Sequence, residues 1–186
     1  MRQSSKEIHI DRKKMIVSRT DLKGVIEFAN KDFMEISGYS LDQLINQPHN
    51  IVRHPDMPSI IFKLMWKRIQ LSQDIFAVVK NRAKNGDYYW VTTKFEIRRD
   101  PLTNKVNGYI AYRQGADTKL VNEITKLYDE LLLIENTSGI DASEKYLIGY
   151  LDSHNKTYDQ FIDDIVGKGW LFKSFFKMMA TMFANK

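Results

Sequence analysis

Cysteine is absent from the 186-residue sequence, which also contains only four prolines and nine glycines. Without thiols there is no disulfide, no thiolate metal site, no cysteine nucleophile and no thioether link to a cofactor. The low proline and glycine content, with 27% charged residues, excludes collagen-like chains and chains that are disordered throughout. The lack of cysteine permits a reducing compartment but does not prove one.

Long apolar runs are missing as well. No window reaches the roughly 18 uncharged apolar residues that a membrane-spanning helix needs. The first 14 residues are polar and lack the apolar centre of a secretory signal. We therefore expect a cytoplasmic protein, either free or peripheral to the inner membrane.

Catalytic motifs are also absent. The sequence has no G-x-S-x-G, no phosphate-binding glycine loop, no H-E-x-x-H and no kinase signature. Its acidic residues follow no recognisable catalytic spacing, and we assign no metal ligands. The sequence therefore predicts a binding or signalling protein and not an enzyme.

The net charge of +5 conceals a division along the chain. Residues 1–24 and 25–116 each carry a net +4, whereas residues 117–165 have four Lys against eleven Asp and Glu. Residues 166–186 then have four Lys and no acidic residue. This division indicates separate surfaces for separate partners. Because the basic residues form no dense run, we expect no nucleic-acid partner.

The aromatic content is high, with ten Phe, nine Tyr and three Trp available for a core. The length suits one domain of about 100–150 residues plus an appendage. The predicted order is β-β-α-α-loop-α-β-β-β, with tight turns at 21–24 and at Asn85-Gly86. This order predicts an α+β fold, a five-stranded antiparallel sheet with short helices on one face. The expected strands cover residues 15–17, 25–28, 75–80, 88–97 and 106–112.

Residues that begin and end helices lie between the second and third predicted strands. Asn30 is the expected N-cap of a first helix, which Gly38 ends, and Ser40 begins a second helix. After a proline-rich loop, Asp56 is the expected N-cap of a third helix, with Pro58 in its first turn.

The chain divides into five segments. A polar lead-in (1–13) precedes the main domain (14–116), and an amphipathic acidic helix (117–135) follows it. A second helix (140–166) and a basic apolar tail (167–186) complete the chain. Apolar residues in the acidic helix recur over about two and a half heptads, as in a coiled coil.

The tail combines large apolar side chains with two lysines. Residues 169–183 contain nine Trp, Leu, Phe and Met residues around Lys173 and Lys177. This segment is too short and too charged to span a bilayer. It can lie on a membrane surface, dock as a helix on a partner, or pack on its own domain or a second copy. The sequence leaves these alternatives open.

The predicted loop contains the most unusual group of residues in the sequence: Arg53, His54 and Asp56. An arginine and a histidine just before a helix N-terminus are suited to hold an anion such as pyrophosphate or a carboxylate. The alternative is a rigid turn, with Arg53 on the surface and Asp56 serving only as a cap. These residues alone do not decide between the two.

Aromatic and amide side chains supply further candidates. Trp66, on the third helix, and Trp90, in a central strand, are each able to stack on a planar ligand or to fill the core. Asn81, at the end of a strand, is suited to hydrogen-bond a heterocycle. His49 and His54 are candidate haem ligands, although no haem-attachment motif is present.

Several stretches are distinctive in combination, and together they resemble the PAS domains of Aer-type aerotaxis (energy-taxis) receptors. The resemblance covers roughly residues 14–116, and its long PHN-x-V-RHPDMP string is far more specific than general PAS similarity. The stretches are FAN at 28–30, ISGY at 36–39, QPHNIVRHPDMP at 47–58, VKNRAKNGDYYWV at 79–91 and GYI at 108–110.

This resemblance implies a PAS fold that binds FAD without a covalent bond and reports its redox state. In the family, the Arg, His and Asp of the RHPD motif are required for flavin binding, and they correspond to Arg53, His54 and Asp56. The tryptophan of the next helix corresponds to Trp66, and the asparagine of the KNR run to Asn81. We expect Arg53 and His54 near the pyrophosphate, Asp56 shaping the loop, Trp66 beside the rings and Asn81 at the flavin's polar edge.

Three residues complete the predicted cofactor site: Asn30, His49 and Trp90. The cofactor expected there is FAD, which makes the predicted function a redox sensor module for energy taxis. The alternatives are a cofactor-free PAS domain for dimerisation or docking, and a haem-binding gas sensor.

The expected partner follows from the same resemblance. Receptors of this family continue into transmembrane and methyl-accepting signalling regions that this sequence lacks, so it resembles the separate PAS subunit of a two-part system. We therefore expect a membrane-bound methyl-accepting chemotaxis signalling protein as partner. A homodimer through the PAS domain or through residues 118–135 is a further expectation.

Overall fold

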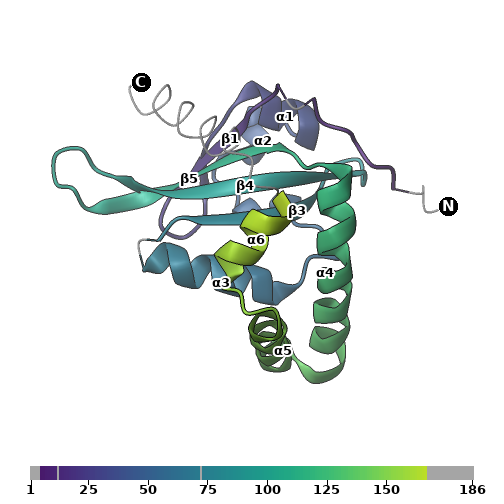
Figure 1. Ribbon diagram of the computed structural model, residues 1–186. Coiled ribbons are helices and arrows are strands. Elements are labelled where there is room, and N and C mark those ends of the chain that lie inside the picture. The colour runs from purple at the N-terminus through teal and green to yellow at the C-terminus, as the bar shows by residue number, and fades with distance from the viewer. Residues whose placement is uncertain (1–4, 12, 72, 167–186) are drawn as a thin grey trace.

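A computed structural model of the chain describes residues 5–11, 13–71 and 73–166. Its centre is one antiparallel five-stranded sheet with the strand order β2-β1-β5-β4-β3, which confirms the predicted α+β fold (Figure 1). The tail at 169–183 lies outside the described residues. The strands are β1 (Ile16–Thr20), β2 (Ile26–Ala29), β3 (Ile75–Arg82), β4 (Tyr88–Arg99) and β5 (Val106–Gly115).

Short helical segments connect β2 to β3. They are α1 (Lys31–Ser37), α2 (Leu41–Leu44), a 3₁₀ turn (His49–Val52) and α3 (Ser59–Gln70). Local sequence explains how the first two helices begin and end. Asn30 caps α1 by accepting a hydrogen bond from the Phe33 amide, Gly38 ends α1 at a φ of 70°, and a Ser40–Gln43 capping box begins α2.

The N-terminus of α3 differs from the prediction. Asp56 does not cap it, because the helix begins at Ser59 and Pro58 occupies the cap position without a side-chain bond. The Glu135 carboxylate, from a helix 75 residues further along the chain, accepts hydrogen bonds of 2.7 Å from the Ser59 and Ile60 amides. A carboxylate at this position satisfies two free N–H groups and the positive end of the helix dipole. Asp56 instead pairs with Lys80 at 2.6 Å.

Three helices follow the sheet: α4 (Thr118–Ser138), α5 (Ile140–Ser153) and α6 (Tyr158–Val166). The acidic helix thus extends three residues past its predicted end at 135, and the predicted helix over 140–166 is divided in two. The division has a local cause, since Asn155 has a φ of 51° and the Thr157 and Gln160 side chains cap a new helix.

The C-terminal helices pack against α3 and the outer edge of β3. Lys63 of α3 pairs with Asp141 and Glu144 of α5, and Arg68 of α3 pairs with Asp159 of α6. The apolar stripe of α4, which suggested a coiled coil, is buried against the chain's own domain. Its buried residues are Leu120, Ile124, Leu127, Tyr128 and Leu131.

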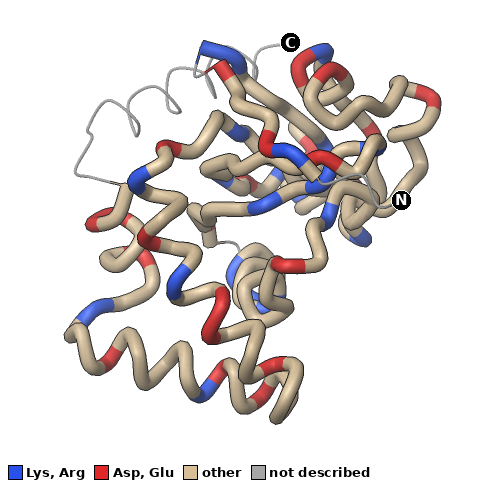
Figure 2. The backbone as a smooth tube through the Cα atoms, turned by 90° about the vertical axis from the view of Figure 1, so that its right-hand side faces the viewer, with Lys and Arg blue, Asp and Glu red and all other residues tan. Residues whose placement is uncertain are grey.

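Charge is distributed over the whole described chain. Basic and acidic residues both occur in the sheet region and in the C-terminal helices, where acidic residues outnumber Lys by eleven to four over residues 117–165 (Figure 2). Among the described residues, no helix has the length and apolar character required to cross a bilayer. The segment predicted as a polar lead-in is partly structured, since Ile8 donates a backbone hydrogen bond of 2.7 Å to Tyr88 and packs on the core.

Candidate functional site

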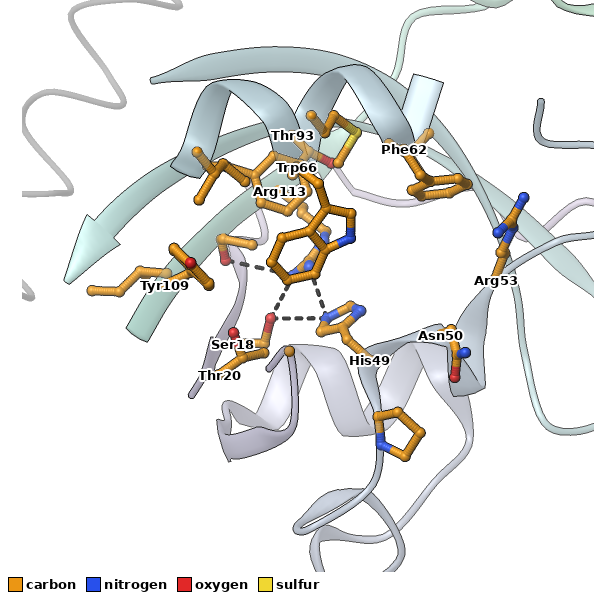
Figure 3. Close-up of a pocket in the computed structure, with 18 of the residues that line it drawn as sticks. Ser18, Thr20, His49, Asn50, Arg53, Phe62, Trp66, Thr93, Tyr109 and Arg113 are labelled. Atoms are coloured by element: carbon orange, nitrogen blue, oxygen red, sulfur yellow. Dashed lines mark hydrogen bonds between the residues drawn. The ribbon is translucent and has the colours of Figure 1, made fainter. Parts of the chain in front are cut away.

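A cavity of about 330 Å³ lies between the sheet and α3, closed on one side by the 3₁₀ turn (Figure 3). The strand register explains its composition, because alternate side chains of β1, β3, β4 and β5 face α3. The wall residues are Ser18, Thr20, Lys23, Gly24, Pro48, His49, Asn50, Arg53, Phe62, Met65, Trp66, Ile69, Val79, Asn81, Thr93, Phe95, Tyr109, Ile110, Ala111 and Arg113.

A buried arginine forms one wall of the cavity. Arg113 of β5 is 2% exposed and donates hydrogen bonds to Ser18 Oγ at 3.0 Å and to His49 Nε2 at 2.8 Å. Its guanidinium also lies over the rings of Phe33 and Phe95. Among the described residues, no Asp or Glu pairs with Arg113, so its charge is held by neutral groups and aromatic faces.

The same contacts fix the state of His49. Arginine can only donate, so His49 Nε2 is the acceptor and the ring proton resides on Nδ1. Burial, together with the neighbouring Arg113 charge, lowers the pKa of His49 to about 3. Burial also lowers the pKa of Arg113, to about 10. Near neutral pH the pair is therefore a neutral imidazole beside a buried cation.

Aromatic side chains form another part of the wall. Trp66 of α3 is 38% exposed and meets Tyr109 of β5 edge to face, with ring centroids 5.6 Å apart. Gly24, at a φ of +80°, allows this arrangement, since a Cβ there would lie 3.1 Å from the indole. Trp66 thus lies in the cavity wall, and its place beside a planar ligand stays a prediction.

The RHPD residues divide between the cavity and the loop behind it. Arg53 lies in the wall, at the end away from Tyr109 (Figure 3), stacks on Phe62 at 4.4 Å and donates to Ser59 Oγ at 2.8 Å. His54 and Asp56 are not wall residues. His54 is 7% exposed, and its Nδ1 accepts a 3.1 Å hydrogen bond from the Asp56 amide.

This arrangement makes His54 and Asp56 part of the loop's framework. His54 packs edge to face against Tyr88, and Asp56 pairs with Lys80 of β3. Burial and the Lys80 charge lower the pKa of His54 below its usual value. The two residues thus hold Arg53 in place by tying its loop to β3.

Asn81 and Thr93 place buried polar groups in the cavity wall. Asn81 is 4% exposed, and its backbone bridges to Arg53, which joins the RHPD loop to β3. Thr93 of β4 is fully buried, and its hydroxyl has no hydrogen-bond partner within the described chain. Polar groups in an apolar cavity are typical of sites that orient a ligand.

Besides His54 and Asp56, two further predicted site residues lie outside the cavity wall. Asn30 uses its side-chain amide within the fold, since Oδ1 accepts from the Val17 and Phe33 amides and Nδ2 donates to the Met15 carbonyl. Trp90 stacks on Tyr128 of α4, with centroids 6.4 Å apart. Neither residue is part of the cavity wall, whereas Arg53, Trp66, Asn81 and His49 all are.

Sequence reasoning missed Arg113, Ser18 and Thr93. One signal was available for Arg113, because it directly follows the strand predicted over 106–112 and continues the alternation of Tyr109 and Ala111. A charged residue at an inward strand position indicates a functional site. Its pairing with His49 was not visible, since 64 residues separate the two.

Comparisons with known proteins agree with this geometry. Residues 26–110 match the model of a family described as a PAS fold. The chain is 40% identical over 118 residues to the aerotaxis receptor of Escherichia coli K12, which covers 62% of this chain and 22% of the receptor. It is 30% identical over 165 residues to a nitrogen fixation regulatory protein of Klebsiella pneumoniae, covering 86% of this chain and 32% of that protein.

A solved structure supports the fold independently. The PAS domain of a Colwellia psychrerythraea protein superposes with a TM-score of 0.50 at 20% identity, covering 55% of this chain and 86% of that one. The chain spans about a fifth to a third of the length of the two sequence relatives. Fold, family match and relatives together show that this chain carries a PAS domain, related in sequence to part of the bacterial aerotaxis receptor.

Proposed function

We propose that this chain is a redox sensor module that binds FAD in the cavity beneath α3. The observation that carries the proposal is the meeting of Arg53, Trp66 and Asn81 in one cavity wall. These three residues come from separate elements, and each corresponds to a flavin-site residue of the Aer-type PAS domains that the sequence resembles. The relationship to the aerotaxis receptor supports a sensory role.

The residues in the wall fit a flavin. A volume of about 330 Å³ lies at the low end of cofactor pockets, which run from about 300 to 1,000 Å³, and it suits a planar ring system. Trp66 and Tyr109 offer apolar faces, and Asn81 offers both a donor and an acceptor. Arg53, at one end of the cavity, would hold the phosphates. Bound flavin would supply reversible electron transfer.

The buried Arg113 is suited to a ligand that gains negative charge. It lacks a carboxylate partner among the described residues, so added negative charge nearby would be stabilised in the low-dielectric interior. Its partner His49 stays neutral and keeps the guanidinium oriented. Because His49 Nε2 is already an acceptor for Arg113, it is not free to ligate iron, which argues against His49 as a haem ligand.

A hydrogen-bond relay connects the cavity with the helix that leaves the sheet. Arg53 donates to Ser59 Oγ, and the Ser59 amide donates to Glu135 of α4. A ligand that draws Arg53 away would change the first contact of this relay. We propose that the redox state reaches a membrane-bound chemotaxis signalling protein by such a shift of α4.

The first experiment is the visible spectrum of the purified chain before and after chemical reduction, followed by FAD titration. A two-band flavin spectrum that bleaches on reduction is the expected result. An intense haem band would replace the proposal with the gas sensor. A colourless protein that takes up no added FAD would favour the docking adaptor.

Variants of the RHPD loop test the assignment of the site. We expect Arg53→Ala to weaken FAD binding roughly tenfold or more, since it removes a charge-assisted contact. His54→Ala should weaken binding by loosening the loop. Lys67→Ala, an exposed position on α3 outside the wall, is the matched control and should bind like the wild type. Full flavin occupancy in both loop variants would show that the site is wrongly assigned.

A further inference from the structure

A buried side-chain hydroxyl in the cavity wall has no hydrogen-bond partner within the described chain. It belongs to Thr93, which lies on the face of β4 toward the cavity. Buried hydroxyls are nearly always hydrogen-bonded in native proteins, so an orphan beside a cavity points to a missing partner.

Thr93 is the orphan that belongs to the wall. It is 0% exposed and is paired in register with Ala77 on β3 and Arg113 on β5. Neither neighbour satisfies it, because Ala77 has no polar side-chain atom and Arg113 donates to Ser18 and His49 instead. Thr93 therefore stands beside the buried cation with an unused donor and acceptor (Figure 3).

Other threonine hydroxyls in the fold find partners locally. Thr125 and Thr137 of α4 donate to carbonyls one helical turn earlier. The adjacent Thr92, on the opposite face of β4, donates weakly to the Gln114 carbonyl at 3.5 Å. Thr93 differs from these in lying against a cavity, where its partner can be a ligand atom.

We propose that Thr93 recognises the ligand by hydrogen-bonding the polar edge of the planar ring system in the cavity. This inference rests on the proposed function, which supplies the ring. A hydroxyl serves as donor or acceptor, so it can pair with either kind of atom at a heterocycle's edge. Met65, an unbranched and adaptable wall residue, allows the ring to approach the strand.

Because the Thr93 hydroxyl has no partner in the protein, the Thr93→Val substitution should have opposite effects on stability and on ligand binding. Valine keeps the shape of threonine but removes a hydroxyl that has no partner in the protein alone. Without ligand, the variant should melt a few degrees higher, roughly 2–4 °C for a chain of this size. With ligand, it should bind riboflavin and FAD about three- to tenfold more weakly, because the ring then loses a partner. Its bound flavin should also show shifted absorption bands.

Thr92→Val is the matched control, since it makes the same change on the opposite face of the same strand. We expect it to melt no higher than the wild type and to bind both flavins with wild-type affinity and spectrum. The experiment measures melting of the ligand-free chains and fluorescence titration with riboflavin and FAD. Riboflavin is included because it carries the ring without the phosphates that Arg53 would hold.

The outcomes separate this inference from the proposed function. If the wild type binds neither flavin, the proposed function fails and the recognition role of Thr93 fails with it. If ligand-free Thr93→Val melts at or below the wild-type temperature, this would contradict the statement that the Thr93 hydroxyl has no partner in the ligand-free chain. Wild-type flavin affinity and spectrum in Thr93→Val would overturn the recognition role while leaving flavin binding intact.

Discussion

At the scale of single residues, the main feature of the cavity is the charged side chain of Arg113, which is buried away from water. Arg113 is held by His49, Ser18 and two aromatic rings, and it retains its charge because its lowered pKa is still about 10. Burying a charge is costly unless other groups compensate for it. A histidine kept neutral by burial serves here as an acceptor, which a protonated imidazole could not be.

This state of His49 predicts a dependence of stability on pH. The pKa of His49 is about 3 in the folded chain and 6.5 in its ordinary state, so the unfolded chain binds the proton more readily. Its contribution to stability is therefore present above about pH 6.5 and is lost as the pH falls from there toward 3. We expect the free energy of unfolding to fall by about 1 kcal/mol per pH unit in this window.

Urea unfolding at pH 7, 6.5, 6, 5.5 and 5 measures that slope. His49→Asn should flatten it, whereas His154→Asn, at an exposed histidine near the end of α5, should leave it unchanged. An equal slope in His49→Asn and the wild type would mean that other groups cause the pH dependence.

At the scale of helices and strands, the decisive contact is the cap of α3 by Glu135. The carboxylate reaches two amides from a different helix, so α4 completes α3 in place of a local N-cap. The ion pairs of Lys63 and Arg68 with α5 and α6 lie at the surface and contribute less. Glu135 is therefore the polar contact that joins α4 to the N-terminus of α3, beside the bond of the Tyr128 hydroxyl of α4 to β3.

Loss of this cap should be measurable. We expect Glu135→Ala to lower the free energy of unfolding by about 1–2 kcal/mol, the usual effect of removing an N-cap. Glu123→Ala, at an exposed position of the same helix, is the control and should change it by less than about 0.5 kcal/mol. Faster hydrogen exchange at the Ser59 and Ile60 amides in the Ala variant would confirm the contact. Unchanged exchange would contradict it.

At the scale of the whole molecule, the C-terminal helices belong to the domain and are not an appendage. α4 and α6 cover β3, which is an edge strand, and the Tyr128 hydroxyl donates to the Val78 carbonyl at 2.8 Å. Covered edges resist unwanted strand pairing. The apolar stripe of α4 is used for this purpose, so it is not available as a coiled-coil seam while the helix stays docked.

A shortened chain tests that conclusion. A variant ending at Ala116 loses the cover of β3 and the Glu135 cap of α3 together. We expect its melting temperature to fall well below that of the full chain and its tendency to associate to rise, because an apolar edge is uncovered. Circular dichroism melting and size-exclusion chromatography measure both. A monomer that melts like the full chain would show that the helices are independent of the domain.

Much of the fold was predictable because its causes are local. Asn30 and the Ser40–Gln43 box cap helices through bonds that span three residues, and turns at 21–24 and Asn85-Gly86 connect neighbouring strands. The resemblance likewise identified Arg53, Trp66 and Asn81, which the fold brings into one wall. Local hydrogen bonds and turn chemistry are visible in the order of residues alone.

Contacts between distant segments were decided only by the tertiary structure. Arg113 meets His49 across 64 residues, and Glu135 replaces Asp56 at the N-terminus of α3 across 76 residues. No local pattern specifies such pairs, because strand register and helix docking determine which side chains meet. The sequence thus determined the strands, the caps of α1 and α2 and the RHPD loop of this protein. Its buried cation, its orphan hydroxyl and the link between cavity and α4 arise from packing.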